Sequence, residues 1–178
     1  MSFAYPPKAN DILSLPVEDL LKATNIGVNA FAAAQAALPG FRDPIHKGHP
    51  KTFIVTGNVL PFLDVVPASY WALGVQKTII SRLIANASQA YEAEGFQFYF
   101  ASMVSTEGGL PDIAEEFRAS GPTHGKVYWE LINNEKQEDW DCRFVKFDAD
   151  QFYLTAGVFL GLQLTGNVPL QRLHRVMI

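Results

Sequence analysis

The stretch Thr52-Phe53-Ile54-Val55-Thr56 is a short run of β-branched and aromatic residues, and Gly57-Asn58 closes it. An apolar run without polar alternation is typical of a strand covered on both faces, as in a parallel sheet. Two further strands are predicted over residues 96–101 and 141–147, and helices over residues 17–38, 69–94 and 124–133. Because helices and strands alternate along the chain, we predict an α/β fold in which right-handed crossovers build a parallel sheet.

Proline and glycine mark the expected ends of the two long helices. Pro39-Gly40 is expected to stop the first helix, and Gly95 to end the second. The apolar residues of the first helix do not form one clean stripe. A helix of this kind is usually buried on several sides, and we expect this of the first helix.

The second half of the chain is less regular. Residues 105–123 are rich in Gly and Pro, which predicts a loop with one short helix over 112–118. Residues 148–178 do not continue the alternation of helix and strand. We therefore predict one α/β domain over residues 1–147 and a C-terminal tail of uncertain structure over 148–178.

Composition narrows the class of protein. The chain has 178 residues, 48% of them hydrophobic, and a net charge of −4 without a basic block, which predicts a soluble domain that does not bind nucleic acid. A single cysteine, Cys142, excludes an intramolecular disulfide framework and is best explained as a small apolar residue in a strand. The N-terminus lacks the pattern of a signal peptide, and the longest apolar run, 152–164, is shorter than the ~20 residues that a membrane span needs. These features predict a cytoplasmic location.

Several blocks of the sequence, in order and spacing, resemble the short-chain dehydrogenase/reductase family, in particular a divergent fungal-type branch. The matching blocks are Leu15-Pro16-Val17-Glu18-Asp19, Asn25, Ala33-Ala34-Gln35-Ala36-Ala37, residues 51–58, Leu73-Gly74-Val75-Gln76-Lys77 and Gly95-Phe96-Gln97-Phe98-Tyr99. The resemblance covers roughly residues 10–147 and only the C-terminal half of the family's fold. It implies a partial Rossmann-type parallel sheet and an NAD(P)-dependent oxidoreductase that acts on a small-molecule substrate.

The resemblance also implies positions for the catalytic groups. The family uses a Tyr as acid and base, a Lys four residues later, a Ser that orients the carbonyl, and an Asn on the preceding helix. Lys77 matches the Lys and Asn25 the Asn, whereas Asn58 occupies the Ser position and Leu73 the Tyr position. Since leucine cannot donate a proton, the sequence predicts impaired turnover. Tyr70, two helical turns before Lys77, is a candidate substitute; the alternative is that it packs as an aromatic residue at the helix start.

On the cofactor side, Val104 and Thr106 match positions that touch the nicotinamide carboxamide, although a solvent loop would also explain them. The family's N-terminal Gly-rich βαβ half, which binds the pyrophosphate, is expected to be lacking. Gly157 and Gly161 do not replace it, because Gln163 stands where the last glycine would be needed.

Two further interpretations remain open. A catalytically inactive fold remnant could act through association, as a homodimer formed by the helices over 17–38 and 69–94, which would cover exposed apolar surface. His46 and His49 have a spacing that metal ligands can share, but no third ligand accompanies them, so we predict no metal site.

Overall fold

The structure is a computed structural model that describes residues 7–8, 10–111, 119–145 and 154–156 of the chain. Within these residues three α-helices and four strands form, joined by loops and short 3-10 helices. They are α1 (Val17–Arg42), β1 (Thr52–Thr56), α2 (Trp71–Ala90), β2 (Gln97–Val104), α4 (Gly121–Asn133), β3 (Asp141–Val145) and β4 (Leu154–Ala156). The short helix predicted over 112–118 lies outside the described residues.

The strands form one sheet in the order β1-β2-β3-β4. Strands β1, β2 and β3 are parallel, with Thr52 opposite Gln97 and Phe100 opposite Asp141, and β4 is antiparallel to β3. The predicted alternation of helix and strand and the parallel sheet are therefore confirmed, and the architecture is that of a partial Rossmann-like α/β fold. Strand β4 comes from the segment 148–178, which we predicted to be a tail of uncertain structure.

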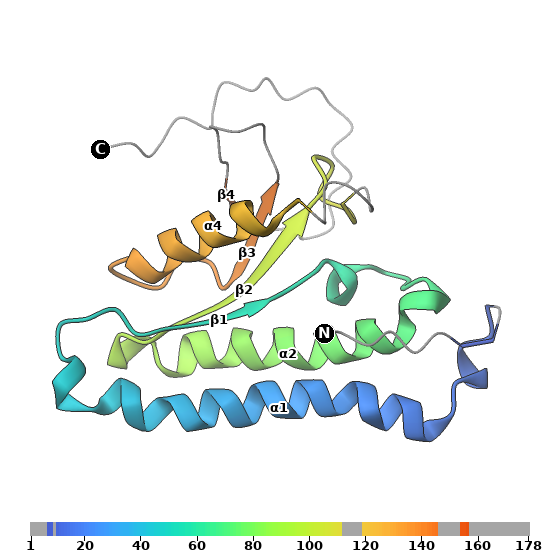
Figure 1. Cartoon of the computed structure of the whole chain (residues 1–178), viewed down its shortest axis with the longest axis horizontal. Coiled ribbons are helices and arrows are strands. Elements are labelled where there is room, and N and C mark those ends of the chain that lie inside the picture. The colour runs from blue at the N-terminus through green and yellow to red at the C-terminus, as the bar shows by residue number, and fades with distance from the viewer. Residues whose placement is uncertain (1–6, 9, 112–118, 146–153, 157–178) are drawn as a thin grey trace.

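Helices cover both faces of the sheet. Helix α2 packs on β2 and α1 packs on α2, whereas α4 lies on the opposite face (Figure 1). All eight residues of β2 are buried, because this strand has a neighbour on each side and helices above and below. The alternation of its side chains sends Phe98 and Phe100 towards Ile80 and Ile84 of α2.

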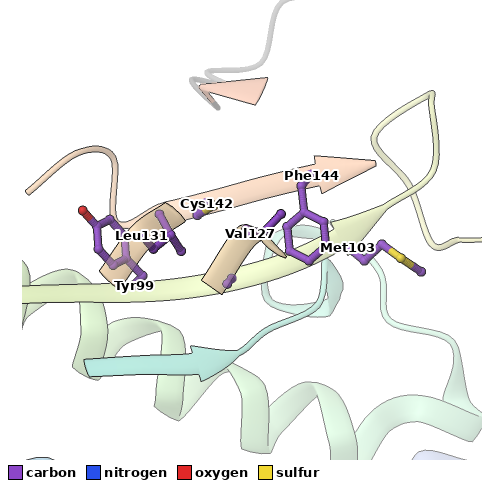
Figure 2. Close-up of a cluster of buried hydrophobic side chains, with 7 residues drawn as sticks. Tyr99, Met103, Val127, Leu131, Cys142 and Phe144 are labelled. Carbon is purple, nitrogen blue, oxygen red and sulfur yellow. The ribbon is translucent and has the colours of Figure 1, made fainter. Parts of the chain in front are cut away.

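The intervening residues of β2 point towards α4. Figure 2 shows this second apolar cluster, built from β2, α4 and β3. Its labelled members are Tyr99, Met103, Val127, Leu131, Cys142 and Phe144. The long apolar strand thus contributes to two separate cores, one on each face of the sheet.

The beginning of β2 extends beyond the beginning of β3, and a side chain completes the hydrogen-bond ladder there. The Gln137 amide oxygen accepts from the Phe98 N–H at 2.7 Å, and its nitrogen donates to the Phe98 carbonyl at 3.2 Å. One glutamine side chain therefore satisfies both backbone groups of a buried residue, as a residue of a neighbouring strand would.

The prediction that Pro39-Gly40 stops the first helix is wrong, since α1 continues to Arg42. Proline removes one backbone donor, but tertiary contacts stabilise the last turn. The Phe41 ring lies 5.3 Å from that of Phe96, centroid to centroid, and Arg42 donates two hydrogen bonds, at 2.7 and 2.8 Å, to the Glu94 carboxylate.

The expectation that α1 is buried on several sides is also wrong. Only Ala23, Gly27 and Ala34 of this helix are buried. At Gly27 the helix approaches α2 so closely that an added Cβ would lie 2.7 Å from Ile79 Cγ2 and 2.9 Å from Ile79 Cβ. The apolar residues Val17, Leu21, Val28 and Phe31 are each more than half exposed. In the single chain, α1 therefore packs through one narrow face.

Other helix boundaries differ from the predictions by a few residues. Helix α2 begins at Trp71, after a 3-10 helix over Ala68–Tyr70, and a second 3-10 helix, Glu92–Glu94, separates it from Gly95. Gly95 adopts φ 72°, a left-handed conformation that favours glycine, as its predicted role at a helix end requires.

Among the described residues, no helix has the length and apolar character needed to cross a membrane.

Candidate functional site

Lys77 anchors a polar site at the carboxyl end of β1. Its Nζ donates to the Thr56 carbonyl oxygen at 2.6 Å, across the junction between α2 and the strand. Burial lowers the pKa of the Lys77 amine below its ordinary value. Within the described part of the chain, no carboxylate forms an ion pair with Lys77. The site therefore holds an amine whose charge no acidic group in these residues neutralises.

The chain leaves β1 through Gly57 and Asn58. Gly57 donates its N–H to the Ala101 carbonyl at 2.7 Å, which continues the pairing of β1 with β2 by one residue. A Cβ at Gly57 would collide with the Ser102 hydroxyl and the Phe100 ring, so only glycine allows this close approach. The Asn58 side-chain oxygen accepts from the Leu60 N–H at 3.1 Å and starts a 3-10 helix. Asn58 therefore already has a backbone partner for its oxygen.

A tyrosine to which we gave no role from the sequence completes the site. The Tyr128 hydroxyl of α4 lies 2.6 Å from the Thr56 hydroxyl, and either group can be the donor. Burial raises the pKa of the Tyr128 phenol, and the hydrogen bond to Thr56 only partly opposes this. Thr56 itself is exposed. Its carbonyl and its hydroxyl thus hold Lys77 from one helix layer and Tyr128 from the other.

The structure does not bring Asn25 or Tyr70 into this network. Asn25 is exposed on α1, and Tyr70 is half-buried in the 3-10 helix that precedes α2. In the described segments, neither the Asn25 amide nor the Tyr70 hydroxyl forms a hydrogen bond. Their catalytic roles remain predictions.

The two residues predicted on the cofactor side lie at the carboxyl end of β2. Val104 is buried in a small cluster with Val59 and Val145. Thr106 is exposed, and its hydroxyl donates to the Glu107 carboxylate at 2.7 Å. The carboxyl ends of β1 and β2 are adjacent, so these residues share one edge of the sheet with Thr56.

The histidine pair lies elsewhere. His46 ends a 3-10 helix that follows α1, and His46 and His49 are both exposed. Among the described residues, no group of three or more His, Cys, Asp or Glu side chains could hold a metal ion.

Comparison with known proteins identifies one informative relative. The chain is 32% identical over 136 residues to a short chain dehydrogenase/reductase, dmxR12, of Cryptosporiopsis sp. (strain 8999). The match covers 76% of this chain and 52% of the relative, so the chain spans about half the length of that protein. No family model and no solved structure matches the chain.

Proposed function

The chain is related over part of its length to the short-chain dehydrogenase/reductase family, and on this premise we propose that it acts as an NAD(P)-dependent oxidoreductase on a small carbonyl or alcohol substrate. The observation that carries the proposal is the position of Lys77, whose amine is fixed on the Thr56 carbonyl at the carboxyl end of a parallel strand. Open α/β sheets bind their ligands at such strand ends. When bound, the nicotinamide would supply the hydride.

The residues at this edge fit part of a dinucleotide. A ribose carries hydroxyl groups that accept hydrogen bonds, and the Lys77 ammonium has three donors, of which the Thr56 carbonyl takes one. Thr106 offers an exposed hydroxyl near the end of β2 for a carboxamide. We propose that Lys77, Thr106 and the backbone beside Val104 hold the nicotinamide end. The cytoplasm, with its pool of these cofactors, is the proposed location.

Cofactor binding tests the proposal directly. Calorimetry and thermal melts of the whole chain with about 1 mM NADPH or NADH should show binding and a rise in Tm of several degrees. Lys77→Ala should abolish the rise, whereas Lys47→Ala, which changes an exposed lysine in the turn after α1, should retain it. A melting temperature unmoved by either nucleotide, together with no calorimetric signal, would refute the proposal.

A second proposal, association through α1, rests on the exposed apolar side chains of that helix. Val17, Leu21, Val28 and Phe31 recur at close to the helical period, so they lie along one face. We propose that a second copy of the chain covers this face, with α2 contributing to the contact, in addition to or in place of catalysis.

Sedimentation tests the association. The wild-type chain should sediment as a dimer at micromolar concentration, and Leu21→Glu with Phe31→Glu should convert it to a folded monomer. Lys22→Glu, on the same helix, controls for added negative charge. A wild-type chain that stays monomeric with a cooperative melt would contradict the dimer.

A further inference from the structure

We infer that Tyr128 is the proton donor of this site, an inference that rests on the proposed oxidoreductase function. Its hydroxyl reaches from α4 to the carboxyl end of β1, where it contacts the Thr56 hydroxyl. Hydride addition to a carbonyl carbon leaves an alkoxide, so the reduction needs a positioned acid. Leu73, four residues before Lys77, carries no acidic hydrogen, and the site must obtain its proton from another side chain.

The contacts of Thr56 favour Tyr128 for this role. The Tyr128 hydroxyl is 2.6 Å from the Thr56 hydroxyl, and the Lys77 amine is 2.6 Å from the Thr56 carbonyl oxygen. One exposed residue at the strand end therefore contacts both a phenol and an amine. Tyr70, the other candidate, forms no hydrogen bond to the described residues of this network.

The Tyr128 phenol holds a proton that it can give up. Burial raises the pKa of the Tyr128 phenol, so the hydroxyl stays protonated at neutral pH. When the Thr56 hydroxyl donates to the phenol oxygen, the phenol's own hydrogen is free for a third group. Among the rings of the described residues, that of His124 contacts the Tyr128 ring edge-on, with centroids 5.8 Å apart.

The reduction adds one hydride to the carbonyl carbon and one proton to the carbonyl oxygen. Bound NADPH would supply a hydride to the substrate carbonyl carbon, and the carbonyl π pair would move to the oxygen. That oxygen takes the proton of Tyr128 to give the alcohol. The Tyr128 phenolate then recovers a proton from water through the exposed Thr56 hydroxyl.

A titration that does not depend on turnover tests the contact. The chain, labelled with ¹³Cζ-tyrosine, is titrated with cyclohexanone as a simple carbonyl probe, and the Tyr128 signal is assigned from Tyr128→Phe. We expect a saturable shift of the Tyr128 signal and no shift of the Tyr70 signal. If the Tyr128 signal does not move, or the Tyr70 signal moves instead, the inference is overturned.

Kinetics with NADPH and the same ketone provide the second test. Tyr128→Phe should lower kcat by ~100-fold or more with KM changed less than ~3-fold, as expected for loss of a general acid. Tyr70→Phe should change neither by more than ~3-fold. Thr56→Val breaks the same hydrogen bond from the other partner, and should lower kcat about tenfold even if Tyr128→Phe does not fold. A kcat lost in Tyr70→Phe and retained in Tyr128→Phe would overturn the inference.

The experiments distinguish a failure of the oxidoreductase function from a failure of the Tyr128 assignment. If NADPH does not bind, the proposed oxidoreductase function is wrong. The ketone titration then decides by itself whether the Tyr128 hydroxyl donates a hydrogen bond to a carbonyl oxygen. If NADPH binds and the ketone is reduced while the Tyr128 signal stays fixed, the function stands and another group supplies the proton.

Discussion

Replacing Gly27 by alanine should destabilise the protein, although alanine is the better helix former. Gly27 lies in the middle of α1, where that helix contacts α2. A Cβ there would lie 2.7 Å from Ile79 Cγ2 and 2.9 Å from Ile79 Cβ. Because the Ile79 Cβ is bonded directly to the backbone, rotation of the side chain cannot move it away. The two helices would have to separate.

The size of the effect follows from two opposing terms. Overpacking a tight contact costs about 1–3 kcal/mol. The change from glycine to alanine in a helix interior contributes a gain of up to about 1 kcal/mol. Gly40 lies in the same helix, and a Cβ there would have no heavy atom within 4 Å. Gly40→Ala therefore isolates the second term, and the two variants should differ in free energy of unfolding by about 1–3 kcal/mol.

Urea denaturation and thermal melts measure this difference. For a chain of this length, 1 kcal/mol corresponds to a shift in Tm of roughly 2–4 °C. In an Ile79→Ala background the penalty at Gly27 should shrink, because two of the three nearest atoms, Cγ2 and Cδ1, are removed. The reasoning is refuted if Gly27→Ala is as stable as Gly40→Ala.

Three further predictions concern Gln137, Cys142 and Lys77, whose side chains are partly or fully buried. Gln137→Ala leaves the backbone N–H and carbonyl of Phe98 unpaired, so the free energy of unfolding measured in urea should fall by about 1–3 kcal/mol. Glu135→Ala, at an exposed position, should lower it by less than about 0.5 kcal/mol. Equal losses for the two variants would contradict this account. Burial raises the pKa of the Cys142 thiol to about 12, so a disulfide reagent at neutral pH should react only after unfolding, and fast labelling of the native chain would show that the thiol is not buried. Burial lowers the pKa of Lys77 below its ordinary value of 10.5. Between the pKa of the folded state and 10.5, the unfolded state therefore binds more protons than the folded state. The free energy of unfolding should rise with pH across that window. Lys77→Met should lack this rise in a series of denaturation curves, and identical slopes for both proteins would exclude the effect.

The order of helices and strands was predictable because local signals carry it. The apolar run in β1 and the aromatic run in β2 are strands in the structure. Boundaries that depend on distant residues were not predictable. Helix α1 continues past Pro39 because Phe41 contacts Phe96 and Arg42 contacts Glu94. Both partners lie beyond β1 and α2 in the sequence.

The site was predictable to the same limited extent. Spacing and resemblance identified Lys77, whose side chain does contact the end of β1. Nothing local distinguishes Tyr128 from an aromatic residue that packs in a core, because its partner Thr56 lies on a strand 72 residues earlier in the sequence. Only the tertiary fold brings the two hydroxyl groups together.

The central position of β2 has a consequence for the route by which the chain folds. Both neighbouring strands pair with β2 from segments roughly 40 residues away along the chain, so each ladder can form only after a long loop has closed. The contacts between α1 and α2 also bridge the whole of β1. High contact order of this kind slows folding and leaves the phenylalanine-rich strand exposed during synthesis, when an unpaired apolar edge favours aggregation. The central position that buries β2 in the native fold thus leaves this strand vulnerable to aggregation in the nascent chain.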